Sequence, residues 1–287
     1  MKKRLFLAVL EGLGIGETPD ASDYGDAGAN TLKAIYDYGK LNVPFLRNLG
    51  LFNLYDIGVG RRSCIVFGAF GQCAPSSRGK DTVEGYLELS GNIVKEELPP
   101  VTDIDSTSFR HLSHHKRTFI DLIRANGKDV LTIGRATDFF GEKAPGVTDS
   151  QSDQRQCLNS IADAIRSSFD GICIAGLPIP RGDSSSGDVA AMCRSLTYFD
   201  KRISKFVQLM NPQDMLIITG LHGSNSPSGE RCSREYVPFL VLSGSIKRAF
   251  RIEDDLSLAD VSATALDFFD IENKLDGTSV LPVISKK

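Results

Sequence analysis

Short apolar runs alternate with longer amphipathic stretches along almost the whole chain, and this alternation restricts the possible folds more than any other feature. The apolar runs, each about as long as a buried strand, are residues 4–10, 63–70, 129–133, 171–175, 215–219 and 237–242. The stretches with helical periodicity are residues 29–38, 114–126, 152–168, 188–210 and 258–269. This order predicts an α/β fold in which helices cover both faces of a mostly parallel central sheet.

The composition is that of one folded domain. The chain has 287 residues, 41% of them hydrophobic and 24% charged, which suits a single α/β domain over residues 1–287. Residues 92–113 contain Pro99 and Pro100 and have no clear periodicity, so we predict a short connecting loop there. Ser257, three residues before Asp260, predicts the N-terminal cap of the last helix.

Charge and hydropathy exclude two classes of partner. The 33 basic and 36 acidic side chains leave a net charge of −3, without the basic excess expected of a nucleic-acid-binding protein. The longest apolar runs, such as residues 5–10, are far shorter than the roughly 18–20 residues that span a membrane. Because Glu11 interrupts the first run, we read it as a buried strand rather than a signal peptide. We therefore expect a cytoplasmic protein whose six cysteines are reduced core residues.

Polar and glycine-rich segments follow several of the predicted strands. They are residues 11–18, 76–82, 178–188 and 220–234. Because function gathers at the carboxyl ends of strands in such sheets, we expect one shared site built from these segments. The chain has only four histidines, His111, His114, His115 and His222, so a metal site would depend on carboxylates or on very few imidazoles.

Two of these segments allow more than one interpretation. Gly12, Gly14 and Gly16 are compatible with a phosphate-binding turn, but Glu17 and Asp20 would repel phosphate, so a structural turn is favoured over a nucleotide site. Residues 76–82 place Thr82 beside a cation and a carboxylate. This arrangement favours either a phosphorylated threonine at a helix start or an ordinary N-terminal cap.

Taken together, the motifs resemble the prokaryotic phosphopentomutases, which belong to the alkaline-phosphatase-like phosphotransferases. The matching segments are residues 10–16, 20–21, 24–32, Gly79-Lys80-Asp81-Thr82, residues 85–88, 134–140, 188–190, 199–202, 219–223 and 234–238. The resemblance implies an alkaline-phosphatase-like core. It also implies interconversion of ribose 1-phosphate and ribose 5-phosphate, or of the deoxyribose pair, through a phosphothreonine at Thr82 flanked by two divalent metals.

The chain departs from the family at the metal ligands that the resemblance implies. The family's first aspartate is Glu11 here, and an aspartate of the fifth-strand end is Leu221, followed by the retained His222. Other family ligands correspond to Pro180, Ser185 and Tyr236. Because two cations need several carboxylates, we do not expect a two-metal centre.

Two alternatives remain open for the chemistry of the site. At most one divalent cation, Mn or Mg, would be held by Glu11, His222 and Asp183 together with Thr82; otherwise the protein has no cofactor. If the site is active, Thr82 is the nucleophile, and Lys80 or His222 activates it.

The resemblance also implies a cap domain inserted at residues 92–113. Because these residues are too few to form a domain, we predict that this chain has no cap. Loss of a cap removes substrate selection and the exclusion of water. We therefore expect a phosphopentomutase-like pseudoenzyme that binds a phosphosugar, a partner protein or a second copy of itself. The alternative is an active phosphoryl-transfer enzyme, either a mutase with rearranged ligands or a phosphatase.

Overall fold

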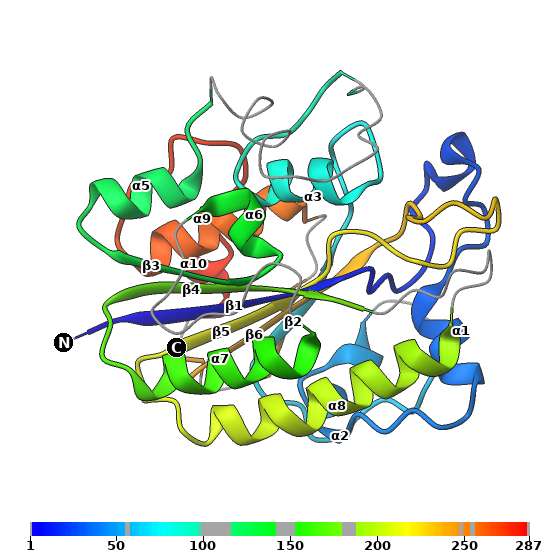
Figure 1. Cartoon of the computed structure of the whole chain (residues 1–287), viewed down its shortest axis with the longest axis horizontal. Coiled ribbons are helices and arrows are strands. Elements are labelled where there is room, and N and C mark those ends of the chain that lie inside the picture. The colour runs from blue at the N-terminus through cyan, green and yellow to red at the C-terminus, as the bar shows by residue number, and fades with distance from the viewer. Residues whose placement is uncertain are drawn as a thin grey trace.

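The central sheet of the protein has seven strands in the order β3-β4-β1-β5-β6-β2-β7 (Figure 1). A computed structural model describes residues 2–54, 58–96, 98, 116–141, 153–179, 188–246, 249–252 and 256–285. The strands are β1 (Arg4–Glu11), β2 (Ala69–Cys73), β3 (Asp129–Gly134), β4 (Gly171–Pro178), β5 (Met215–Thr219), β6 (Val237–Ser243) and β7 (Phe250–Arg251).

Strand direction decides which loops meet at the edge of the sheet. β1 pairs in parallel with β4 and β5, and β3 pairs in parallel with β4. β6 runs antiparallel to both β5 and β2, so its first residue, Val237, lies opposite Cys73 at the end of β2. The segment that enters β6 therefore lies at the same edge as the segments that leave β1, β2 and β5.

Helices cover both faces of the sheet (Figure 1). One face carries α3 (Thr82–Leu89), α5 (Phe119–Ala125), α6 (Ala136–Phe140), α9 (Leu258–Phe268) and α10 (Leu281–Ile284). The other carries α1 (Thr31–Asp37), α2 (Pro44–Asn48), α7 (Gln154–Arg166) and α8 (Val189–Val207). Leu5, Leu7 and Val9 pack into the first layer and Phe6, Ala8 and Leu10 into the second, which explains why β1 is apolar at consecutive positions.

The predicted α/β class and mostly parallel sheet are confirmed, with differences in particular elements. The strand expected at residues 63–70 is displaced, because the sheet pairs Ala69–Cys73 with β6. Ser63 instead bonds to Asn53, its backbone N–H donating to the Asn53 side-chain oxygen at 2.8 Å. The short elements α2, α6, α10 and β7 were not predicted, since a few residues carry no measurable periodicity.

Helix starts follow local capping signals. Asp260 accepts a hydrogen bond from the backbone N–H of Ser257 at 2.6 Å, so the predicted start of α9 is correct. The helix expected from residue 114 begins as α5 at Phe119, because Thr118 and Asp121 form a capping box there.

The cysteines form no disulfide within the described part of the chain, and they are not all core residues. Cys73, Cys157, Cys173 and Cys193 are buried, whereas Cys64 is exposed and Cys232 is half-buried. Cys64 lies in the segment before β2, outside the sheet. The expectation of six core cysteines was therefore wrong for these two.

Several predictions fall on residues outside the described part of the chain. These are Asp183, Pro180 and Ser185 of the fourth-strand loop, most of the loop at residues 92–113, and His111, His114 and His115. Among the described residues, the helices are too short or too polar to cross a membrane.

Candidate active site

The segments that follow β1, β2 and β5 meet the segment that enters β6. The backbone N–H of Ile15 donates to the Tyr236 carbonyl at 2.9 Å, and the N–H of Tyr236 donates to the Gly16 carbonyl at 2.8 Å. Gly223 and Ser233 exchange backbone hydrogen bonds at 2.9 and 3.1 Å. Arg234 accepts from the backbone N–H of Thr18 and donates to the carbonyl oxygens of residues 77 and 79, so three of the four polar segments predicted to form one site are held together. The fourth lies largely outside the described residues.

Thr82 is the first residue of α3. The cap is Asp81, whose side chain accepts hydrogen bonds from the backbone N–H groups of Val83 at 2.6 Å and Glu84 at 3.1 Å. Since Asp81 occupies the cap, the Thr82 hydroxyl is not used to start the helix. It lies instead at the positive end of the helix dipole, where negative charge is stabilised.

The Thr82 hydroxyl is hydrogen-bonded to His222. Its Oγ1 lies 2.9 Å from His222 Nε2, and His222 Nδ1 lies 2.7 Å from the carbonyl oxygen of Gly223. Because a carbonyl oxygen only accepts, Nδ1 carries a proton, and when the ring is neutral Nε2 accepts from the Thr82 hydroxyl. Both residues are buried. The pair has the arrangement of a nucleophile with its base.

Glu11, at the end of β1, contacts two side chains of the protein, one through a hydrogen bond and one through an ion pair. The Tyr86 hydroxyl donates to Glu11 Oε1 at 2.6 Å, and Arg135 Nε forms an ion pair with Oε2 at 3.1 Å. The Glu11 side chain is fully buried. Burial, followed by the neighbouring Glu11 charge, raises the pKa of Tyr86 well above its ordinary value, so its proton stays in the hydrogen bond.

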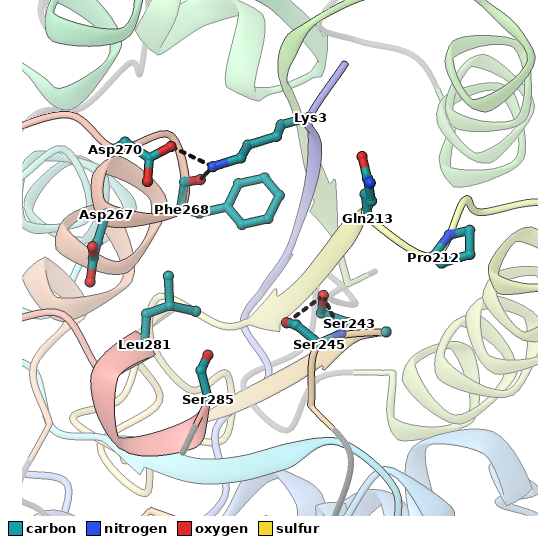
Figure 2. Close-up of a pocket in the computed structure, with 11 residues that line it drawn as sticks. Lys3, Pro212, Gln213, Ser243, Ser245, Asp267, Phe268, Asp270, Leu281 and Ser285 are labelled. Carbon is teal, nitrogen blue, oxygen red and sulfur yellow. Dashed lines mark hydrogen bonds and ion pairs between the residues drawn. The ribbon is translucent and has the colours of Figure 1, made fainter. Parts of the chain in front are cut away.

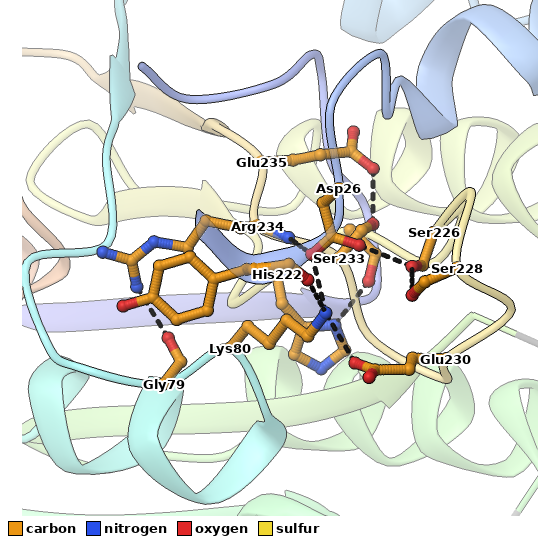
Figure 3. Close-up of polar contacts among 12 residues, drawn as sticks. Asp26, Gly79, Lys80, His222, Ser226, Ser228, Glu230, Ser233, Arg234 and Glu235 are labelled. Carbon is orange, nitrogen blue, oxygen red and sulfur yellow. Dashed lines mark hydrogen bonds and ion pairs between the residues drawn. The ribbon is translucent and has the colours of Figure 1, made fainter. Parts of the chain in front are cut away.

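Lys80 is held as a cation by acidic partners (Figure 3). Its Nζ lies 2.8 Å from Asp26 Oδ2 and 2.5 Å from Glu230 Oε2, and it donates to the Tyr24 carbonyl at 2.8 Å. Burial works to lower the pKa of Lys80, but these two carboxylates outweigh it, and the net shift is upward. A lysine with a raised pKa is a poor base, so in this arrangement His222, not Lys80, is the group placed to take the Thr82 proton.

Arg234 positions the segment that leads to Thr82 (Figure 3). Its guanidinium donates to the carbonyl oxygens of Pro75, Ser77 and Gly79 at 2.6 to 2.7 Å. It also bonds to Asp20 and stacks on the Tyr24 ring, 4.6 Å from the ring centroid. Since Arg234 is almost fully buried, these contacts fix residues 75–79 against the segment before β6.

Glu235 fills the glycine turn after β1. Its Oε2 accepts from the backbone N–H groups of Gly16 at 3.2 Å and Thr31 at 2.9 Å, and its Oε1 accepts from the Thr31 and Ser233 hydroxyls at 2.7 Å. Burial raises the pKa of Glu235 even though these bonds oppose the shift. A carboxylate of the chain therefore already accepts from the Gly16 N–H, which favours the structural turn over a nucleotide site.

The described residues do not fit a two-metal centre. Both ring nitrogens of His222 and both carboxylate oxygens of Glu11 contact protein atoms. The described part of the chain contains no group of three or more histidine, cysteine, aspartate or glutamate side chains that could hold a metal. Leu221 and Tyr236 stand where the resemblance places further ligands, and neither is a usual ligand for these cations.

A family profile matches more than half of the chain. The matching family is described as the metalloenzyme superfamily, over residues 106–273. The chain belongs to the metalloenzyme superfamily. Its core is alkaline-phosphatase-like, and the similarity to phosphopentomutases that the motifs indicated is confirmed over the full chain.

The relatives of this chain include phosphopentomutases. The one from Clostridium kluyveri is 25% identical over 390 positions, covering 99% of this chain and 100% of the relative. The one from Dictyoglomus turgidum is 26% identical over 392 positions, covering 99% of this chain and 98% of the relative. Both alignments exceed the 287 residues of this chain, so the relatives contain positions without a counterpart here.

Solved structures share the fold at low identity. The PH0037 protein from Pyrococcus horikoshii has a TM-score of 0.57 at 12% identity, covering 96% of this chain and 99% of that chain. The phosphonate monoester hydrolase SpPMH from Silicibacter pomeroyi has a TM-score of 0.53 at 12% identity, covering 99% of this chain and 77% of that chain. At this identity the likeness establishes the fold alone.

Sequence reasoning missed the side chains that surround the predicted site residues. Arg135, Tyr86 and Asp26 all lie in segments that carried the resemblance, but nothing in those segments indicated their partners. Glu11 and Arg135 are far apart in sequence and meet because β4 pairs with both β1 and β3. The available signal was the position of Arg135 at the carboxyl end of a strand, where polar groups gather.

A separate cavity lies at the opposite edge of the sheet (Figure 2). It has a volume of about 690 Å³, and its lining includes Lys3, Gln213, Ser243, Phe268 and Asp270. Lys3 Nζ donates to the Phe268 carbonyl at 3.2 Å and pairs with Asp270 at 2.5 Å. Lys3 precedes β1, whereas Glu11 ends it, so this cavity is not part of the candidate active site.

Proposed function

We propose that the protein is a phosphopentomutase-like member of its superfamily that has lost two-metal mutase chemistry and binds a phosphorylated sugar. The observation that carries this proposal is the state of His222. Its Nδ1 proton is donated to a backbone carbonyl and its Nε2 lone pair accepts from Thr82, and among the described residues no group of three or more histidine, cysteine, aspartate or glutamate side chains could hold a metal there. Without the metals, transfer through a bisphosphate intermediate loses the charge neutralisation that phosphoryl transfer requires.

The length of the chain supports the same proposal. Phosphopentomutase relatives align over about a hundred more positions than this chain has residues. We place the missing part at residues 92–113, where the family's cap domain would be inserted. A site without a cap admits water and does not retain a released bisphosphate, which favours binding over isomerisation. We also propose a cytoplasmic location and, as further ligands of the open site, a partner protein or a second copy of the chain.

Metal analysis and ligand titration test this proposal together. Purified protein is analysed by plasma mass spectrometry, and ribose 5-phosphate is titrated calorimetrically in the presence of EDTA. We expect less than one tightly held Mn or Mg ion per chain and saturable binding of the sugar phosphate. Two tightly held ions per chain, or sugar-phosphate binding that requires added metal, would contradict the proposal.

The hydrogen bond between Thr82 and His222 favours a second candidate, phosphoryl transfer without mutase turnover. In it, Thr82 Oγ1 attacks a phosphoryl group of the sugar bisphosphate and its proton passes to His222 Nε2. The bond between that phosphorus and the sugar oxygen breaks, and the departing sugar oxygen takes the proton from His222. Intact-mass measurement after incubation with a sugar bisphosphate tests this candidate. A phosphate adduct on the wild type that is absent from Thr82→Ala supports it, and an unmodified wild type refutes it.

A further inference from the structure

Arg135 is held rigidly at the edge of the sheet where the candidate active site lies. It follows Gly134, which ends β3 with a φ of +59°, and it caps α6. A Cβ at position 134 would lie 2.4 Å from the Gly176 carbonyl, so the close approach of β3 to β4 requires glycine there. The backbone N–H of Arg135 donates to the same carbonyl at 3.3 Å. The turn therefore directs residue 135 toward the ends of β4 and β1.

The Arg135 side chain is only partly buried, unlike the carboxylate with which it pairs. Its side chain is 26% exposed, whereas that of Glu11 is 0% exposed. The ion pair uses Nε, at 3.1 Å from Glu11 Oε2. Within the described residues, neither Nη atom of Arg135 has a hydrogen-bond partner, and a guanidinium offers two donors on each of these atoms.

The Arg135–Glu11 pair and the Thr82–His222 pair belong to one site. Tyr86, which bonds Glu11 Oε1, lies on α3 one turn after Thr82. On the other side, Gly12 directly follows Glu11, and a Cβ built on it would lie 3.9 Å from His222 Cε1. A cation fixed at Glu11 is thus close to the Thr82 hydroxyl.

We propose that the Arg135 guanidinium replaces a metal cation beside Glu11 and that its Nη groups bind the phosphate of the ligand. The inference rests on the proposed function and assigns the phosphate-binding group of that site. Arginine is permanently charged, and its planar fork matches phosphate oxygens in a bidentate manner. The Glu11 carboxylate keeps the fork in place, and the positive charge of Arg135 repels a divalent cation from the same carboxylate.

Calorimetric titration of ribose 5-phosphate in EDTA tests the phosphate-binding role. We compare the wild type with Arg135→Gln and with Arg166→Gln, which removes the same charge from an exposed position on α7. Because a charge-assisted hydrogen bond to phosphate is lost, we expect Arg135→Gln to bind about tenfold more weakly or worse, with Arg166→Gln unchanged. Equal affinity of Arg135→Gln and wild type overturns the inference and leaves the proposed function standing.

The single variant leaves a buried carboxylate without its cation, which threatens folding. The double variant Glu11→Gln/Arg135→Gln removes both charges together, and the same weakening is expected in it. Retained wild-type affinity in the folded double variant overturns the inference.

Manganese titration followed by electron paramagnetic resonance tests the replacement of the metal, and it does not depend on any sugar phosphate. We expect the wild type and Glu11→Gln to give the same signal of free Mn²⁺, because Arg135 excludes the ion from Glu11. Mn²⁺ binding by the wild type that disappears in Glu11→Gln overturns the inference. Failure of the wild type to bind ribose 5-phosphate refutes the proposed function instead, so the two failures are distinct.

Discussion

Replacement of Glu84 by glutamine should remove a large part of the pH dependence of folding stability. Glu84 lies in the first turn of α3, beside the capping carboxylate Asp81. Burial, and then the hydrogen bond and charge of Asp81, raise the pKa of Glu84 from 4.5 to about 8. Asp81 meanwhile accepts two backbone N–H groups as the cap of α3, and the raised pKa of Glu84 places the proton of the pair on Glu84.

The sign and size of the effect follow from this shift. Because the folded pKa lies above the unfolded one, the folded protein binds more protons between about pH 4.5 and pH 8. The contribution of Glu84 to stability is full below this range and decreases as the pH rises through it. Each pKa unit corresponds to about 1.4 kcal/mol, and solvent that reaches the pair screens part of the repulsion, so we expect a loss of about 2 kcal/mol.

Urea unfolding followed by circular dichroism measures this loss at about pH 5 and about pH 8. Glu84→Gln mimics the protonated side chain, so its free energy of unfolding should match the wild type at the lower pH and exceed it at the higher pH. Asp163→Asn, which alters an exposed acid on α7, is the control and should not change the pH dependence. If Glu84→Gln loses as much stability as the wild type between the two pH values, the assignment of the proton to Glu84 is refuted.

Two further predictions concern the turn after β1 and the cysteines. Gly12→Ala should destabilise the protein by about 2 kcal/mol or more in thermal or urea unfolding, because Gly12 has a φ of +87° and a new Cβ would lie 2.1 Å from Ser224 Oγ. Gly127→Ala is the matched comparison, with a φ of +70° but open space around the new Cβ; a cost as large as that of Gly12→Ala would contradict the steric argument. Iodoacetamide applied to the folded protein should modify Cys64, which is exposed, before Cys173, because burial raises the pKa of the Cys173 thiol to about 12. Peptide mass spectrometry reads out the order, and earlier modification of Cys173 would show that its burial is wrong.

The layered fold follows from local sequence properties. Consecutive apolar residues in β1 are required because helices cover both faces of the sheet, and the run of apolar residues is plain in the sequence itself. The start of α9 is equally local, since Ser257 and Asp260 satisfy each other within one turn. Short elements such as α6 and β7 could not be predicted from the sequence, because they form through contacts with neighbouring elements and are too short to show a periodic pattern.

The sequence alone also indicated part of the candidate site. Thr82, Lys80, Glu11 and His222 follow predicted strands, and the expectation that strand ends meet brought them together. The hydrogen bond between Thr82 and His222 joins two of these residues across 140 positions of sequence. Their resemblance to a phosphotransferase site needed only the order and approximate spacing of motifs.

The partners of these residues were decided by tertiary structure. Lys80 is fixed as a cation by Asp26 and Glu230, and Glu11 by Arg135 and Tyr86, none of which the sequence connects. The physical reason is strand order and direction. β4 lies between β1 and β3, which brings Arg135 to Glu11, and the reversal of β6 brings residues 233–236 to the loop that leads to Thr82. A sequence specifies which residues are polar, but only the arrangement of the strands decides which of their charges meet.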